Sequence, residues 1–295
     1  MLIKSPIPFR YIFNKVRTDV FKVLIFSAIF HIFKYYIAEL PAIPHSLPTI
    51  LGTCISLLLA FNLNQSYDRW WEARKIWGAI VNDSRSLILL LKGFSPEHPL
   101  VSKIGLRQIE WCYTLGETLR SNTEVSDDQR ELLTDDDSSY VRQHNNAALA
   151  LLMLHSHDLN EIRKMGAISE FQQVEVMSAI TRLCDSMGMA ERIKTTVFPM
   201  TYRIFVHLFI YLFLIILSMA LVQSIGFLEV PILTLMASTF FLIEKTASQM
   251  QDPFSNQPTD TPMTAIARTI EINLKQLLGE ADVPQPVMAE RYYLM

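Results

Sequence analysis

One long apolar segment limits how this chain can fold more than any other feature. Residues Ile204 to Ile225 read IFVHLFIYLFLIILSMALVQSI and carry no Asp, Glu, Lys or Arg. A helix that crosses the apolar core of a bilayer, roughly 30 Å thick, needs about 20 mostly apolar residues. The segment therefore has the length and composition of a membrane-spanning helix, and we expect this part of the chain to lie in a lipid bilayer.

Three further segments come close to the same length and apolar character. They run from Phe21 to Ile37, from Pro48 to Asn64 and from Phe227 to Ile243. The first is weakened by three polar side chains, those of Lys22, His31 and Lys34. Charged residues make up 19% of the chain, below the roughly 25% of soluble proteins. We therefore predict four membrane helices and a substantial part outside the membrane.

The distribution of positive charge predicts how these helices are oriented. Lys and Arg precede the first and third segments and follow the second and fourth. The short connections within each pair contain neither residue. Because Lys and Arg accumulate on the cytoplasmic side, both termini and the long middle region are predicted to be cytoplasmic. The expected location is the inner (cytoplasmic) membrane, with several passes. The net charge of -3 gives no indication of nucleic-acid binding.

The chain divides on this basis into five parts. They are a cytosolic N-terminal segment (1–20), two membrane helices (21–64), a cytosolic helical region (65–202), two more membrane helices (203–244) and a cytosolic C-terminal segment (245–295). Apolar residues recur at helical spacing in the middle region, so the predicted fold is all-α. A polar stretch from Ser121 to Asn146 includes the run Asp135, Asp136 and Asp137. It lacks the pattern of a calcium loop and is predicted to be a solvated loop.

The second membrane segment continues directly into charged sequence, SLLLAFNLNQSYDRWWEARKIWG. No glycine or proline interrupts the junction, so a single helix is expected to leave the membrane here. Residues four apart drift by only about 40° around a helix, which places Thr53, Leu57 and Phe61 on one face. This face is either packed core or the lining of a hydrophobic constriction, and the residues leave both interpretations open.

Polar and aromatic side chains follow that face. We expect them to hold the helix at the inner interface: Asn62, Asn64, Asp68, Arg69, Trp70, Trp71 and Glu72. Arg69 lies three residues before Glu72, a spacing that allows charge pairing along the helix. Tryptophan suits a boundary between apolar and wet surroundings. The helix could thus extend a conduit beyond the bilayer.

These residues closely resemble the signature of the bestrophin family in its prokaryotic branch, where an apolar helix leads into an Arg-Trp-Trp segment. Three other stretches resemble the family in the same order along the chain. They are MGMAERIKTTVFPMTY before the third membrane segment, QDPFSNQPTDTPM after the fourth, and IARTIEINLKQLLGE near the C-terminus. The resemblance covers nearly the whole chain.

The resemblance implies a homopentameric ion channel around one central pore, with the second segment of each subunit lining an apolar neck. By position, the family's three neck rings fall on Thr53, Leu57 and Phe61. Thr53 departs from the bulky aliphatic residue usual at the first ring, which puts a gating role for that ring in doubt. A cytosolic constriction would lie near Phe171. Animal relatives conduct chloride, whereas prokaryotic-type members can prefer monovalent cations such as sodium or potassium, so the sign of the permeant ion stays open.

The resemblance also bears on metals and cofactors. Animal bestrophins carry an acidic run after the fourth segment that completes a calcium clasp. The corresponding stretch here contains only Glu244, Asp252 and Asp260 as acids. Calcium requires six to eight oxygen ligands. We therefore expect no metal site, no calcium activation and no cofactor.

Three rival functions remain. An enzyme is disfavoured because no catalytic motif is present, and because His155 and His157 would point about 160° apart on a helix. A secondary carrier is disfavoured by the absence of repeats and broken helices. The third rival is a membrane-tethered helical scaffold. The polar groups inside the membrane segments, His31, His207 and Gln223, are expected to hydrogen-bond to neighbouring helices.

Overall fold

The computed structural model describes residues 8–36, 43–44, 46–120, 132–196, 199–289 and 293. The side chains of Phe9, Tyr35, Met200 and residues 222–225 lie outside this description. The chain forms two compact units. We call Ser5–Arg69 with Val197–Gln251 the apolar unit, and Trp70–Thr196 with Asp252–Met295 the helical body.

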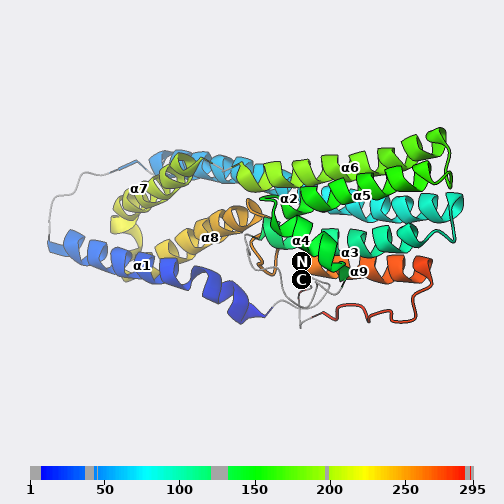
Figure 1. Cartoon of the computed structure of the whole chain (residues 1–295). Helices are drawn as coiled ribbons and strands as arrows, with labels where there is room; N and C mark the ends of the chain where they lie inside the picture. The colour runs from blue at the N-terminus through cyan, green and yellow to red at the C-terminus, as the bar shows by residue number, and fades with distance from the viewer. Residues whose placement is uncertain are drawn as a thin grey trace. The chain divides into compact units, whose positions relative to one another are not determined.

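Helices form the regular structure of both units, as predicted (Figure 1). The apolar unit contains α1 (Phe9–Tyr36), the first part of α2 (Ser46–Phe94), α7 (Met200–Ile225) and α8 (Glu229–Met250), with a short 3-10 turn at Gly226–Leu228. The helical body contains the rest of α2 together with α3 (Pro99–Leu119), α4 (Asp135–Arg142), α5 (Ala147–Lys164), α6 (Glu170–Thr195) and α9 (Met263–Leu278).

Three helices in the described residues are long and apolar enough to cross a membrane. They are α2, the Thr201–Leu221 part of α7, and Gly226–Met250, which includes α8. They correspond to the second, third and fourth predicted segments. The first predicted segment lies largely within α1, which is also long but is not among the three. Its polar residues lower its apolar character, so a fourth membrane helix remains a prediction.

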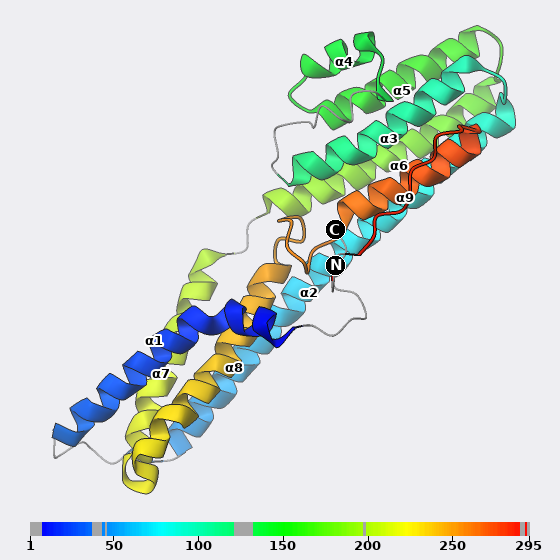
Figure 2. The ribbon, with the colours of Figure 1, turned by 90° about the horizontal axis from the view of Figure 1, so that it is seen from below.

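The apolar unit packs α1 along α8 and α7 (Figure 2). Its core joins all four helices through apolar side chains: Val23, Ile55, Leu59, Val206, Ile210, Phe213, Leu214, Leu233, Ala237 and Phe241. Gly52 lets the rings of α7 approach α2, because a Cβ there would lie 3.2 Å from the Phe213 ring. Close approach at small residues is a common way to pack helices in membranes.

Buried polar groups also connect the helices of the apolar unit. Lys34 on α1 lies 2.7 Å from the carboxylate of Glu229 on α8 and donates a hydrogen bond to Ser218 on α7. His31 lies 3.3 Å from the same carboxylate. His207 lies 3.3 Å from Glu244. The prediction that these histidines hydrogen-bond to neighbouring helices is confirmed for His31. Nε2 of His207 lies within ion-pair distance of Glu244 but makes no hydrogen bond with a described residue, and the side chain of Gln223 lies outside the described residues.

The helical body is a bundle in which α3 packs against α5, α6 and α9 (Figure 2). Its core is large and mostly aliphatic, with the rings of Trp77 and Trp111 fully buried in it. The apolar periodicity noted in the middle region corresponds to α3, α5 and the end of α2. His155 is buried and lies 3.1 Å from Gln108, whereas His157 is exposed beside Asp158, so the two point apart as their spacing predicts.

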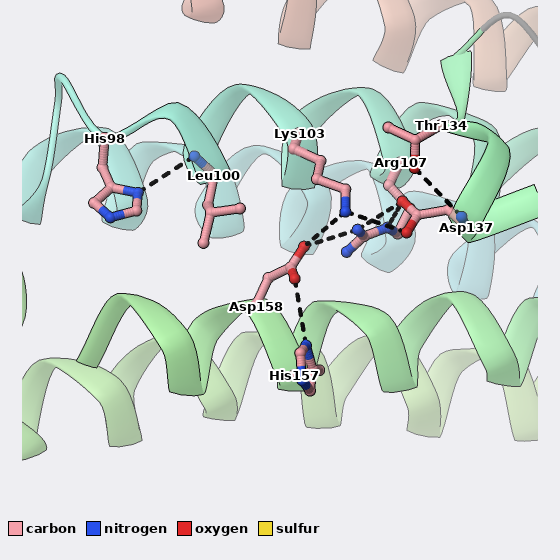
Figure 3. Close-up of polar contacts among 8 residues, drawn as sticks. All are labelled: His98, Leu100, Lys103, Arg107, Thr134, Asp137, His157 and Asp158. Atoms are coloured by element: carbon pink, nitrogen blue, oxygen red, sulfur yellow. Dashed lines mark hydrogen bonds and ion pairs between the residues drawn. The ribbon is translucent and has the colours of Figure 1, made fainter. Parts of the chain in front are cut away.

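The predicted loop between Ser121 and Asn146 is wrong in part, because α4 lies within it (residues 121–131 are outside the described part). Thr134 caps the helix by accepting a hydrogen bond from the Asp137 amide, and the three aspartates form its first turn. Acidic groups are stabilising there because they face the positive end of the helix dipole. Asp137 is buried against Arg107 of α3, as Figure 3 shows.

Candidate pore-lining helix and its supports

The candidate site is built on one helix. α2 runs without a break from Ser46 to Phe94, through the junction where the apolar sequence becomes charged. Between Gly52 and Gly78 no residue is glycine or proline, so each backbone amide can continue the hydrogen-bond ladder. The prediction of a single continuous helix is confirmed.

The predicted neck residues lie on an exposed face of α2. Leu57 is 58% exposed and Phe61 57% exposed, and Thr53 is exposed as well. Ile55 and Leu59, on the opposite side of the same turns, are buried in the core of the apolar unit. Of the two interpretations left open by the sequence, packing in the core of the subunit is therefore wrong for Leu57 and Phe61.

The hydroxyl group of Thr53 is bound within its own helix. Its Oγ1 donates to the backbone oxygen of Thr49 at 2.9 Å, one turn earlier. The methyl group is then the part of the side chain that is free to face outward. A threonine whose hydroxyl donates within its own helix presents a less polar surface than its composition suggests.

The end of α8 supports the inner part of the exposed face. The buried side chain of Asn62 accepts a hydrogen bond of 3.1 Å from the side-chain amide of Gln251. Arg69 donates from Nε to the backbone oxygen of Gln251 at 2.9 Å. Both residues were predicted supports of the interface. Their common partner, Gln251, was not predicted, because contacts between distant helices leave no periodic signal in a sequence.

Supports of α2 also lie within the helical body. Trp70 donates from its indole nitrogen to the backbone oxygen of Thr259, at 2.9 Å. The Trp71 ring stacks on it with 6.2 Å between centroids and is 46% exposed. Glu72 pairs with Arg192 on α6 at 3.1 Å, so its carboxylate connects two helices.

Two predicted residues of α2 remain exposed without a described support. Asn64 and Asp68 both lie on the outer surface of the apolar unit. Phe171, the candidate for a cytosolic constriction, is 90% exposed in the first turn of α6. Ser169 caps that helix through a reciprocal pair of hydrogen bonds with Gln172, which fixes where the helix begins. A phenylalanine so exposed on a well-formed helix needs an explanation outside the folding of one subunit.

The segment after α8 uses its acids internally. Burial raises the pKa of Asp252, but hydrogen bonds from Lys194 and from the backbone N–H of Phe254 outweigh that effect and leave its pKa lowered. Asp260 accepts a hydrogen bond from the backbone N–H of Gln257 at 2.9 Å, and burial raises its pKa to about 6. Among the described residues, no group of three or more His, Cys, Asp or Glu is arranged to hold a metal ion.

Known proteins resemble this chain over most of its length. The family model described as "Bacterial/Fungal Bestrophin protein" matches residues 2–276. The "voltage-dependent anion channel-forming protein YneE" of Escherichia coli O157:H7 is 32% identical over 83% of this chain and 80% of its own length. A protein of Nostoc sp. named in the same way, alr2987, is 28% identical over 88% of this chain and 86% of its own length.

Solved structures agree with this result. The crystal structure of a mutant of the bacterial bestrophin homologue from Klebsiella pneumoniae superposes with a TM-score of 0.84. It is 25% identical and covers 90% of this chain and 100% of its own. This chain belongs to the bestrophin family, in its bacterial and fungal branch.

Proposed function

We propose that the protein is an ion channel that lets monovalent ions flow passively through a central pore, with Thr53, Leu57 and Phe61 of each subunit lining an apolar neck. The observation that carries this proposal is the exposure of Leu57 and Phe61 on a helix whose neighbouring apolar residues are buried. Large apolar side chains that one subunit leaves exposed on a regular face are suited to a role in the assembled protein.

An assembly is required for this function. The few apolar helices of one chain do not enclose a wet pore, so the proposal includes a closed homo-oligomer, expected to be a pentamer. In it, an apolar ring resists ion flow because a narrow apolar passage dewets, without any moving plug. The proposal places the oligomer in the inner membrane with both chain termini in the cytoplasm. It gives Phe171 the role of a second, cytosolic constriction.

The names of the relatives support anions as the first ions to test. The Escherichia coli and Nostoc proteins are called voltage-dependent anion channel-forming proteins. Chloride is therefore the leading candidate for the permeant ion, with monovalent cations as the alternative. The proposal includes no calcium activation, since Asp252 and Asp260 are held by donors of the protein itself.

The test is an electrical recording from the purified oligomer in a planar bilayer under a KCl gradient. The proposal predicts unitary current steps and a reversal potential close to the chloride or the potassium equilibrium potential. Chelation of calcium should leave the currents unchanged. A correctly assembled oligomer that passes no current, or one that shows saturable flux with counterflow and no unitary steps, would contradict the channel and favour the scaffold or the carrier.

A further inference from the structure

The first charge after the neck on the exposed face of α2 belongs to Asp68. It follows Phe61 by seven residues, which is nearly two full turns and about 10.5 Å along the helix axis. Counted around the axis, Asp68 lies about 20° from Leu57, and Phe61 lies about 40° from Leu57 in the same direction. The carboxylate thus occupies the same narrow strip as the two neck residues, and all three belong to the apolar unit.

The neighbouring charged side chains of α2, unlike Asp68, make contacts within the protein. Arg69 is directed to the backbone oxygen of Gln251, and Glu72 pairs with Arg192. The carboxylate of Asp68 is exposed and has no hydrogen bond or ion pair with any residue that the structure describes. An exposed, unpaired carboxylate keeps its full charge available to ions that approach the face on which it lies.

We propose that Asp68 sets the balance between anion and cation flow at the inner end of the neck. This inference rests on the proposed function, because only an assembly around a pore turns one carboxylate per subunit into a ring. Such a ring concentrates cations and depletes anions at the point where ions enter or leave the neck. The apolar neck itself opposes the entry of anions and cations alike, because both lose hydration water there. Selection between anions and cations therefore depends on the nearest charged side chain.

A positive charge on the same strip could offset the effect of Asp68. Lys75 is exposed and follows Asp68 by a further seven residues of α2, about 10.5 Å along the axis. That rise is longer than the screening length of about 8 Å at physiological ionic strength. The potential at the inner end of the neck is therefore dominated by Asp68, with Lys75 acting further along the path.

The test compares reversal potentials of purified protein in a planar bilayer under a KCl gradient, for the wild type, Asp68→Asn and Asp83→Asn. Asp68→Asn should move the reversal potential toward the chloride equilibrium value, with a rise in the chloride-to-potassium permeability ratio on the order of threefold to fivefold. Asp83→Asn removes one carboxylate from the same helix, but one that pairs with Arg182 at 2.7 Å. It should leave the ratio within about 1.5-fold of the wild type, since its charge is neutralised by a partner.

A second measurement needs no variant. Raising the salt on both sides from 0.05 M to 1 M screens the ring of carboxylates. The chloride-to-potassium permeability ratio of the wild type should therefore rise, and that of Asp68→Asn should stay the same. If the wild-type permeability ratio does not change with salt and Asp68→Asn does not shift the reversal potential, the inference about Asp68 is wrong. The proposed channel function would still stand. Absence of wild-type current would instead overturn the proposed function on which the inference depends.

Discussion

At the scale of single residues, Asp260 shows how burial changes the chemistry of one group. It is 1% exposed, and its pKa rises from 3.8 to about 6 because burial penalises the charged carboxylate. The nearby charge of Asp252 acts in the same direction. A sequence shows that an aspartate is present but not that it is buried, so this shift could not be predicted from the TDTP stretch in which Asp260 lies.

The raised pKa predicts a dependence of stability on pH. Between about pH 4 and pH 6 the folded chain keeps a proton on Asp260 that the unfolded chain has lost, so the free energy of unfolding falls as pH rises through this range. Asp260→Asn removes this penalty. Its stability should exceed that of the wild type by on the order of 2–3 kcal/mol at pH 7 and equal it near pH 4. Thermal unfolding in detergent between pH 4 and pH 8 measures the difference.

Asp252→Asn is the matched control, since the pKa of Asp252 is shifted the other way. A carboxyl group with a lowered pKa stabilises the fold above its unfolded pKa and loses that contribution as pH falls. Asp252→Asn should therefore lower stability at pH 7. Equal pH profiles for the wild type and Asp260→Asn would show that Asp260 titrates normally.

At the scale of elements, α4 depends on tertiary contacts for its existence. It has only eight residues, and helices shorter than about 12 residues are marginal by themselves. Arg107, which is fully buried on α3, lies 2.7 Å from Asp137 on α4 and 2.7 Å from Asp158 on α5. Lys103 lies 3.2 Å from Asp137 as well. Figure 3 shows the carboxylates converging on the guanidinium group.

Removing the guanidinium should release α4. Arg107→Gln leaves two carboxylates without their main partner, and breaking a buried pair in this way costs roughly 3–5 kcal/mol. We expect faster amide hydrogen exchange in α4 and a lower melting temperature. Arg163→Gln is the control: Arg163 and Glu170 form an exposed pair at 3.0 Å, and its loss should cost less than about 1 kcal/mol. Unchanged exchange in α4 of Arg107→Gln would contradict the anchoring role.

Helix α4 also shows what could not be predicted from the sequence. The long helices were predictable in two ways. In α5 the apolar residues recur at helical spacing, and α7 is an apolar run long enough to cross a membrane. The aspartate run of α4 looks like solvated sequence, and only the distant Arg107 makes it a buried helix. On α2 the spacing placed Thr53, Leu57 and Phe61 on one face, but only the packing of the neighbours Ile55 and Leu59 showed that this face is outside the core.

At the scale of the whole molecule, the proposed pore requires an assembly of several chains. Leu57, Phe61 and Phe171 are all large, apolar and exposed in one subunit. We expect the detergent-solubilised protein to run as a single homo-oligomer with the mass of five chains, measured by native mass spectrometry. A monomer that retains channel activity would contradict the view that these side chains serve a shared pore.

The central claim is that ions pass the apolar face of α2. It is tested most directly by the unitary conductance of Phe61→Ala beside that of Phe205→Ala, both as assembled oligomers in planar bilayers. The two phenylalanines are equally exposed, at 57%, but Phe205 lies on α7. Widening an apolar constriction eases its wetting, so Phe61→Ala should raise the conductance by at least about twofold and Phe205→Ala should leave it unchanged. Equal conductance in Phe61→Ala and the wild type would contradict the account.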